Sequence, residues 1–231
     1  MGTIEGGNER SGRVGASMGI AFVVLFVAGF VIFPVPSSNK AKDTLKWQQW
    51  WNDSGHRAGA IIGAYLIVLG VLAFVWFAWN LRLRLQDRDR LQDRSGLMFT
   101  FGSLFAGIAL VSVMVRASIP GAKQFGSTPV PAGDLARQFD QIGFGLLLVA
   151  GALCAGLFVA LASFLARRTG TLPGWLTIAG YVIAVLQLAA SFFFPFVLFP
   201  LWVLVAAIVF LRSRSPELDA AATSATTRGQ A

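Results

Sequence analysis

The sequence predicts an all-α, polytopic membrane protein with six transmembrane helices arranged as three hairpins. Two observations predict this class. Only 13% of the residues are charged and 55% are hydrophobic, whereas a soluble domain carries about twice that charged share. In addition, six apolar runs contain no Asp, Glu, Lys, Arg or His, and they cover residues 14–33, 58–81, 97–115, 142–166, 172–191 and 195–211. At about 1.5 Å per helical residue, each run is about long enough to cross roughly 30 Å of hydrocarbon.

The runs leave space for one membrane domain and two short tails. Residues 14–211 form the predicted six-helix membrane domain, and residues 1–13 form a cytoplasmic N-terminal tail. We interpret the first run as a retained helix because it exceeds a signal-peptide core and lacks an Ala-x-Ala cleavage site. Residues 212–231, which are rich in Ala, Thr and Ser, are predicted to be a disordered cytoplasmic tail.

The net charge of +8 is explained by membrane topology rather than by a nucleic-acid partner. If both termini are cytoplasmic, twelve of the nineteen basic residues lie on the cytoplasmic side. Cytoplasmic loops of membrane proteins carry such an excess of Arg and Lys. The sequence therefore predicts an N-in, C-in protein of the cell (inner) membrane, with the lipid bilayer as its main partner and no nucleic acid.

The first hairpin joins runs 14–33 and 58–81 through a long outer loop. In this loop Trp47, Trp50 and Trp51 fall at helical spacing, which is typical of an amphipathic turn that lies in the membrane interface. Indole rings favour the headgroup depth, so these three residues are predicted to be interface anchors, a reading favoured over ligand stacking. One of three adjacent polar residues is expected to cap the second run: Asn52, Asp53 or Ser54.

The second hairpin joins runs 97–115 and 142–166, and its outer loop contains a predicted helix start at Asp134 that continues into the fourth run. The inner loop 82–94 before it mixes five Arg with three Asp. We interpret that loop as a solvated connector whose arginines fix the topology, because the interleaved carboxylates weaken binding of anionic lipid.

The third hairpin joins runs 172–191 and 195–211 through a tight turn around Phe194-Pro195. Pro173 is suited to the first turn of its helix and Trp175 to the inner interface, where it is a further predicted anchor. Gln187 lies within the run and is expected to form a hydrogen bond with a neighbouring helix.

Small residues one helical turn apart predict close helix packing. They occur as Gly59/Gly63, Gly102/Ala106 and Gly151/Ala155. Such pairs allow helix backbones to approach each other, either within one chain or between copies, and the sequence leaves both open.

The sequence shows no set of residues typical of catalysis, so we predict no enzyme, no catalytic residue, no metal site and no cofactor. His56 is the only histidine, and Ser54 and Asp53 beside it lie too near in sequence to form a Ser/His/Asp triad. A membrane haem b needs two axial side chains, commonly both His. A metal site also needs several such ligands, so the single His argues against a metal site as well.

The best remaining cluster is charged and lies at the predicted outer ends of the second, third and fourth runs. It contains His56, Arg57, Arg116, Arg137 and Asp140. An ion pair between Arg116 and Asp140 that locks the helices together is the favoured interpretation. The alternative is the mouth of a site for an anionic ligand.

Several of these segments resemble an actinobacterial group of six-pass integral membrane proteins of unknown function. The most specific segment is Thr169-Gly170-Thr171-Leu172-Pro173-Gly174-Trp175, a Thr-Gly-x-Leu-Pro-x-Trp entry to the fifth run. His56-Arg57, the segment 77–82, Asp140 and the segment 201–212 carry the rest of the resemblance. The resemblance implies a six-helix domain in the inner membrane, with no established activity or cofactor.

The predicted function follows from helices without charged groups. We expect a structural or interaction protein, such as an accessory subunit, whose partner is another membrane protein or a second copy of the chain. The alternative is a carrier or binding protein for a lipid or small hydrophobic molecule, which needs only an apolar cleft with a polar mouth.

Overall fold

The computed structural model describes residues 5–36, 44–86, 92–126, 128–188 and 194–212. Its described part is all-helical and contains no strand. The helices are α1 (Glu5–Ile32), α2 (Thr44–Asn52), α3 (Ser54–Gln86), α4 (Gln92–Gly126), α5 (Gly133–Leu146), α6 (Ala152–Thr169), α7 (Gly174–Leu186) and α8 (Leu198–Arg212). A π-helical segment, Leu147–Gly151, joins α5 to α6, and a 3-10 turn, Phe194–Val197, precedes α8.

Five helices in the described part are long and apolar enough to cross a membrane. They are Val14–Ile32, Ser54–Gln86, Arg94–Gly126, Gly133–Thr169 and Pro195–Arg212. The apolar helix α7 has only 13 residues and spans about 20 Å by itself. The predicted all-α class is therefore confirmed, whereas the sixth crossing stays a prediction.

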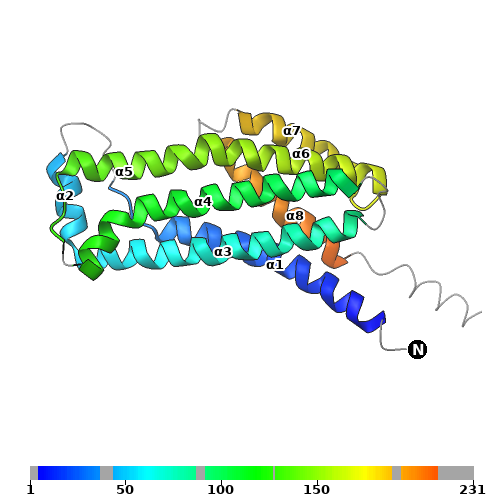
Figure 1. Ribbon diagram of the computed structural model, residues 1–231, viewed down its shortest axis with the longest axis horizontal. Helices are drawn as coiled ribbons and strands as arrows, with labels where there is room; N and C mark the ends of the chain where they lie inside the picture. Colours follow the sequence, from blue (N-terminus) through cyan, green and yellow to red (C-terminus); the bar gives the residue numbers. More distant parts are fainter. Residues whose placement is uncertain (1–4, 37–43, 87–91, 127, 189–193, 213–231) are drawn as a thin grey trace, which may run out of the picture.

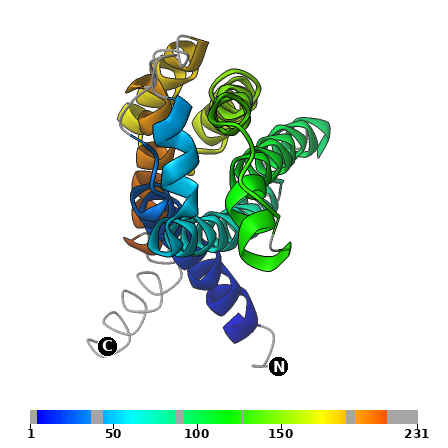
Figure 2. The ribbon, with the colours of Figure 1, turned by 90° about the vertical axis from the view of Figure 1, so that its left-hand side faces the viewer.

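The long helices lie side by side along the length of the molecule, as Figure 1 shows for α3, α4 and the continuous helix of α5 and α6. α1 packs on α3, and α2 lies across one end of the bundle (Figures 1 and 2). α7 packs chiefly on α6, whereas α8 packs chiefly on α1. The first described residues of α1 and the last of α8 lie at the end opposite α2 (Figure 1).

The turn from α6 to α7 is built by glycine and proline. Gly170 adopts φ 66° and ends α6, a left-handed conformation that costs glycine little. The N–H of Thr171 then donates to the carbonyl of Ala166 at 3.1 Å. Pro173 lies immediately before α7, so the Thr-Gly-x-Leu-Pro-x-Trp segment forms a compact reversal between two helices.

Five phenylalanine rings, one from each of α1, α3, α4, α6 and α8, meet at the centre of the bundle. This phenylalanine cluster consists of Phe22, Phe74, Phe105, Phe158 and Phe199, and all five residues are fully buried. The centroids of neighbouring rings lie 4.7–6.4 Å apart, within the range of favourable aromatic pairs. The centre of the bundle is therefore filled by large apolar side chains.

Glycines bring α1 and α3 into backbone contact. A Cβ atom at Gly63 would lie 2.8 Å from the carbonyl oxygen of Gly29 and 2.9 Å from the backbone nitrogen of Phe33. A Cβ atom at Gly102 would lie 3.0 Å from the ring of Phe158. The predicted small-residue positions Gly63 and Gly102 thus pack within the chain.

Candidate functional site

The predicted ion pair between Arg116 and Asp140 is present at the α2 end of the bundle. Arg116 lies on α4 and Asp140 on α5, and the distance from Arg116 Nε to Asp140 Oδ1 is 2.8 Å. The two side chains are only 6% and 13% exposed. This pair is therefore largely withdrawn from solvent, where the loss of one partner is costly.

Three aromatic rings surround the guanidinium of Arg116. The distance from Arg116 Cζ to the ring centroid is 4.6 Å for Phe33, 5.4 Å for Phe144 and 5.8 Å for Phe30. A cation over such rings is attracted by their electron-rich faces. Phe30 lies on α1, Phe33 directly follows α1, and Phe144 lies on α5. The guanidinium of Arg116, on α4, therefore holds three helices together.

Gly143 allows α5 to approach α4 beside this ion pair. A Cβ atom at Gly143 would lie 2.5 Å from Arg116 Cγ and 2.7 Å from the carbonyl oxygen of Ser112. The hydroxyl of Ser112 donates to the carbonyl of Gly143 at 2.7 Å, and this hydrogen bond is buried. The sequence alone did not predict this contact, although Gly143 lies three residues after Asp140 and so on the same helix face.

The other residues of the predicted cluster have different contacts. His56 stacks on Trp50, with ring centroids 3.6 Å apart and an interplanar angle of 7°. Arg57 Nη1 donates to the carbonyl oxygen of Asn52 at 2.6 Å. Arg137 Nη2 lies 3.7 Å from Asp134 Oδ1 on its own helix. The structure thus brings Arg116 and Asp140 together and places His56, Arg57 and Arg137 in separate contacts.

The tryptophans of α2 differ from the prediction of interface anchors. Trp47 and Trp51 are 1% and 2% exposed and belong to the apolar core, and Trp50 is half-buried. The physical reason is that the face of α2 that carries Trp47 and Trp51 packs against the protein, where α2 contacts α5 and α3. Trp175, in contrast, is 60% exposed.

A glycine and a hydrogen bond hold α2 on the start of α5. Gly133 lies so close to Thr44 that any side chain there would overlap the Thr44 carbonyl. The hydroxyl of Thr44 also donates to Asp134 Oδ1 at 3.0 Å. Helix α2 therefore lies across the end of the bundle, packed on α5 and α3.

Asp53 caps α3. Its Oδ1 accepts the backbone N–H of His56 at 2.9 Å, as a side chain at the N-cap position commonly does. This backbone hydrogen bond is the main reason why the pKa of Asp53 lies below its ordinary value of 3.8. Of the three predicted candidates, Asp53 is the residue that caps the helix.

The Asp53 cap predicts an acid-sensitive contribution to stability. Because the folded-state pKa is lowered, the contribution is complete above the unfolded value of about 3.8 and is lost as the pH falls through the folded pKa. We expect Asp53→Asn, which keeps an acceptor oxygen, to remove this part of the pH dependence. The measurement is the thermal unfolding midpoint of the purified protein at neutral and at acidic pH. The same acid-induced drop in wild type and Asp53→Asn would contradict this assignment.

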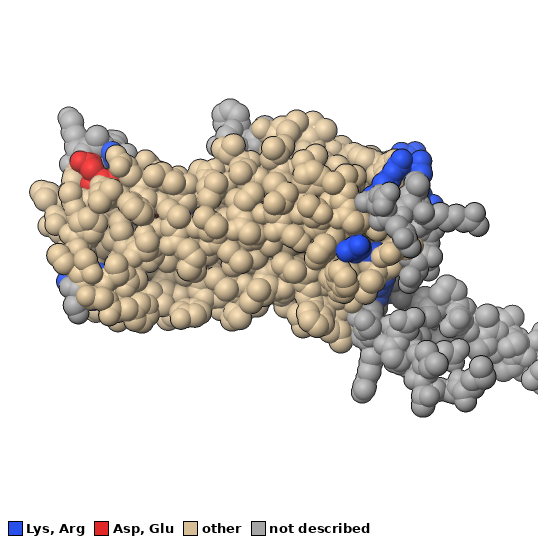
Figure 3. All heavy atoms as spheres, viewed as in Figure 1, with Lys and Arg blue, Asp and Glu red and all other residues tan. Residues whose placement is uncertain are grey.

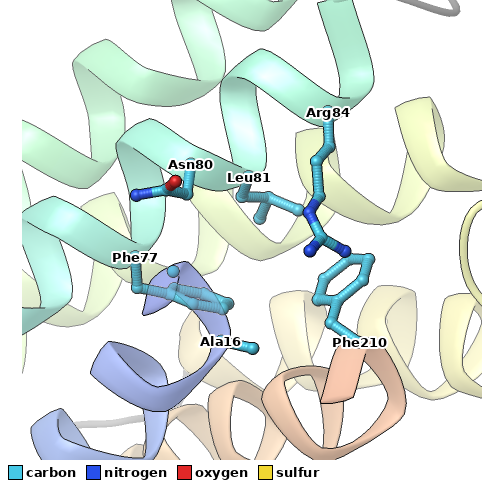
Figure 4. A pocket seen from close by; sticks show the side chains of 7 residues that line it. Ala16, Phe77, Asn80, Leu81, Arg84 and Phe210 are labelled. Atoms are coloured by element: carbon cyan, nitrogen blue, oxygen red, sulfur yellow. The ribbon is translucent and has the colours of Figure 1, made fainter. Parts of the chain in front are cut away.

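A small hollow lies at the opposite end of the bundle, between α1, α3 and α8 (Figure 4). Its cavity volume is about 10 Å³, far below the roughly 300–1,000 Å³ typical of ligand sites. It is lined by Gly15, Ala16, Phe77, Asn80, Leu81, Arg84 and Phe210. The amide of Asn80 donates to the carbonyl of Trp76 at 2.8 Å, and the guanidinium of Arg84 lies 5.0 Å from the Phe210 ring centroid. Its polar groups therefore already have contacts within the protein.

Five long apolar helices indicate a multi-pass helical membrane protein, and in Figure 3 the charged side chains gather at the two ends of the bundle. Comparison of the chain with protein-family models, with curated proteins and with solved structures finds no match.

Proposed function

We propose that this protein is a structural or interaction protein of the cell membrane, an accessory subunit without catalytic activity of its own. The observation that carries the proposal is that large side chains fill the interior of the bundle and that a buried ion pair joins two of its helices. The phenylalanine cluster occupies its centre and the Arg116–Asp140 pair joins α4 to α5. Its apolar outer faces are then the surfaces available for contact with lipid and with other helices.

The proposal includes six crossings with both termini in the cytoplasm. The first described residues of α1 and the end of α8 lie at the same end of the bundle (Figure 1), which fits an even number of crossings. Six arginines with described side chains belong to that end: Arg82, Arg84, Arg94, Arg167, Arg168 and Arg212. An excess of arginine favours the cytoplasmic side. In this proposal α7 and the residues that follow it supply the remaining crossing.

The proposal also includes membership in the actinobacterial group of six-pass proteins. The resemblance at Thr169–Trp175 supports it, and in the structure this segment forms the short reversal between α6 and α7. The group carries no established activity, so this membership adds an inner-membrane location and no chemistry.

The outer face of α4 is a candidate contact surface for a partner helix. Leu104, Val111 and Met114 on this face are 48%, 52% and 51% exposed. Between them Gly107 is exposed, and nothing lies within 4 Å of a Cβ atom placed there. A glycine among large apolar residues allows another helix backbone to approach closely.

A bulky residue at Gly107 is expected to weaken association without disturbing the fold. Gly107→Leu fills space that is empty in the single chain, so the unfolding midpoint should stay near that of wild type, whereas a helix packed on this face is displaced. The measurement is the mass of the complex extracted from native membranes. Tyr65→Leu, at a 65% exposed position on α3, is the matched control. An unchanged complex in Gly107→Leu would exclude this face as the contact.

The carrier hypothesis has less support from the geometry. A carrier would need an apolar cleft beside a polar mouth. The space around Arg116 is occupied by Asp140 and by the rings of Phe30, Phe33 and Phe144. The small hollow lined by Asn80 and Arg84 lies at the other end.

The proposed function is tested by extraction of the tagged protein from its native membrane in a mild detergent. We expect a particle larger than the 24.7 kDa chain with its detergent, which contains either one membrane-protein partner at fixed stoichiometry or further copies of the chain. A monomer without a protein partner would contradict the accessory role.

A further inference from the structure

Two arginines from different helices lie on one phenylalanine ring at the arginine-rich end of the bundle. Arg94, in the first turn of α4, has its Cζ 5.1 Å from the ring centroid of Phe164. Arg168, near the end of α6, has its Cζ 4.7 Å from the same centroid. The two guanidinium carbons are therefore at most about 10 Å apart. We call these three residues the double-arginine site.

Among the described side chains, the charged ones at the end of the bundle that holds the double-arginine site are all arginines. The carboxylates whose side chains the structure describes, Asp53, Asp134 and Asp140, all belong to the opposite end. In Figure 3 the described acidic residues appear only at that end, beside some basic ones. The adjoining segment 87–93 lies mainly outside the described residues and contains three Asp and two Arg. When this segment is added to the six arginines with described side chains, eight Arg stand beside three Asp, which leaves a surplus of positive charge.

We propose that Arg94 and Arg168 together bind the phosphate of an anionic phospholipid. The ring of Phe164 attracts each guanidinium but carries no net charge, so it does not neutralise the two like charges. A phosphate between them does, and guanidinium groups bind phosphate oxygens through paired hydrogen bonds.

The depth of the site fits a lipid headgroup. Arg94 shortly precedes the apolar run 97–115, and Arg168 shortly follows the apolar run 142–166, so both lie where the hydrocarbon core gives way to headgroups. Arg168 is exposed and Arg94 is half-buried. Leu97, one turn from Arg94 on the same helix face, is 48% exposed and provides apolar surface for an acyl chain. A lipid therefore matches both the charge and the apolar surface, whereas free phosphate matches the charge alone.

The test measures binding of phosphatidylglycerol and phosphatidylcholine to the full-length protein by native mass spectrometry in detergent. We expect wild type to prefer phosphatidylglycerol, and Arg94→Gln/Arg168→Gln to lose roughly tenfold or more of that affinity. The control Arg167→Gln/Arg212→Gln removes the same charge from two exposed residues at the same end and should lose much less. Helical content and elution volume identify a variant that misfolds. If the double variant misfolds, Arg94→Gln and Arg168→Gln are measured singly, and each should lose an intermediate share of the phosphatidylglycerol affinity.

Three results would overturn the proposal. If the control variant loses as much affinity as Arg94→Gln/Arg168→Gln, or if neither loses any, the lipid is not held at the double-arginine site. If inorganic phosphate displaces phosphatidylglycerol as effectively as an equal concentration of short-chain phosphatidylglycerol does, the site binds free phosphate and the lipid assignment is wrong. This test reads lipid affinity and not protein partners, so it can fail while the proposed accessory role holds.

Discussion

Asp140→Ala is expected to destabilise the protein by about 3–5 kcal/mol, the usual cost of breaking a buried ion pair. Arg116 is only 7% exposed, so its charge would lose its carboxylate partner without gaining water. The cation–π contacts with Phe30, Phe33 and Phe144 remain, but they offset a small part of that loss. The measurement is the free energy of unfolding of the purified protein in mixed micelles.

Two comparisons isolate the effect of the Arg116–Asp140 pair. Asp134→Ala removes a carboxylate from the same helix, but that side chain is 59% exposed and lies 3.7 Å from Arg137. It also accepts the exposed hydrogen bond from Thr44, so we expect a loss of about 1 kcal/mol. The double variant Arg116→Met/Asp140→Leu removes both charges and should recover most of the stability that Asp140→Ala loses. An equal loss in Asp140→Ala and Asp134→Ala would show that the pair does not fasten the helices.

Gly63→Val is expected to cost about 3 kcal/mol, at the upper end of the usual range for overpacking. The obstacle is the backbone of α1, since a Cβ atom at Gly63 would lie 2.8 Å from the Gly29 carbonyl oxygen. A backbone cannot move aside as a flexible side chain can, so α1 would have to separate from α3. The measurement is again the free energy of unfolding.

The control for Gly63→Val is the same substitution at Gly145 on α5. Nothing lies within 4 Å of a Cβ atom at Gly145, so Gly145→Val should change the free energy of unfolding by less than about 1 kcal/mol. If both variants lose the same amount, the cost arises from valine in a helix and not from the contact between α1 and α3.

The sequence predicted most of the fold because membrane helices are set by local composition. An apolar run must satisfy its backbone hydrogen bonds within itself, which makes it a helix wherever it packs. The fifth run shows the limit of this reasoning. Within its range 172–191 the structure describes a regular helix of only 13 residues, Gly174–Leu186. The sequence did not predict this end, because composition alone does not say where a helix ends.

The candidate site was predicted in part. Arg116 and Asp140 pair as expected, since opposite charges at similar depth on adjoining helices have few other partners. Trp47 and Trp51 were misjudged, because helical spacing of indoles is the same whether the helix faces lipid or protein. The phenylalanine cluster and the contact at Gly143 depend on how distant helices are rotated, which a single sequence does not specify.

The central claim is that the chain crosses the bilayer six times with its arginine-rich end in the cytoplasm. It is tested most directly by labelling single cysteines with a membrane-impermeant maleimide in intact cells, in a Cys154→Ala background. We expect Thr128→Cys to be labelled from outside, and Ser11→Cys and Ser213→Cys to react only after the cells are permeabilised. Labelling of Ser213→Cys in intact cells, or protection of Thr128→Cys, would contradict this claim.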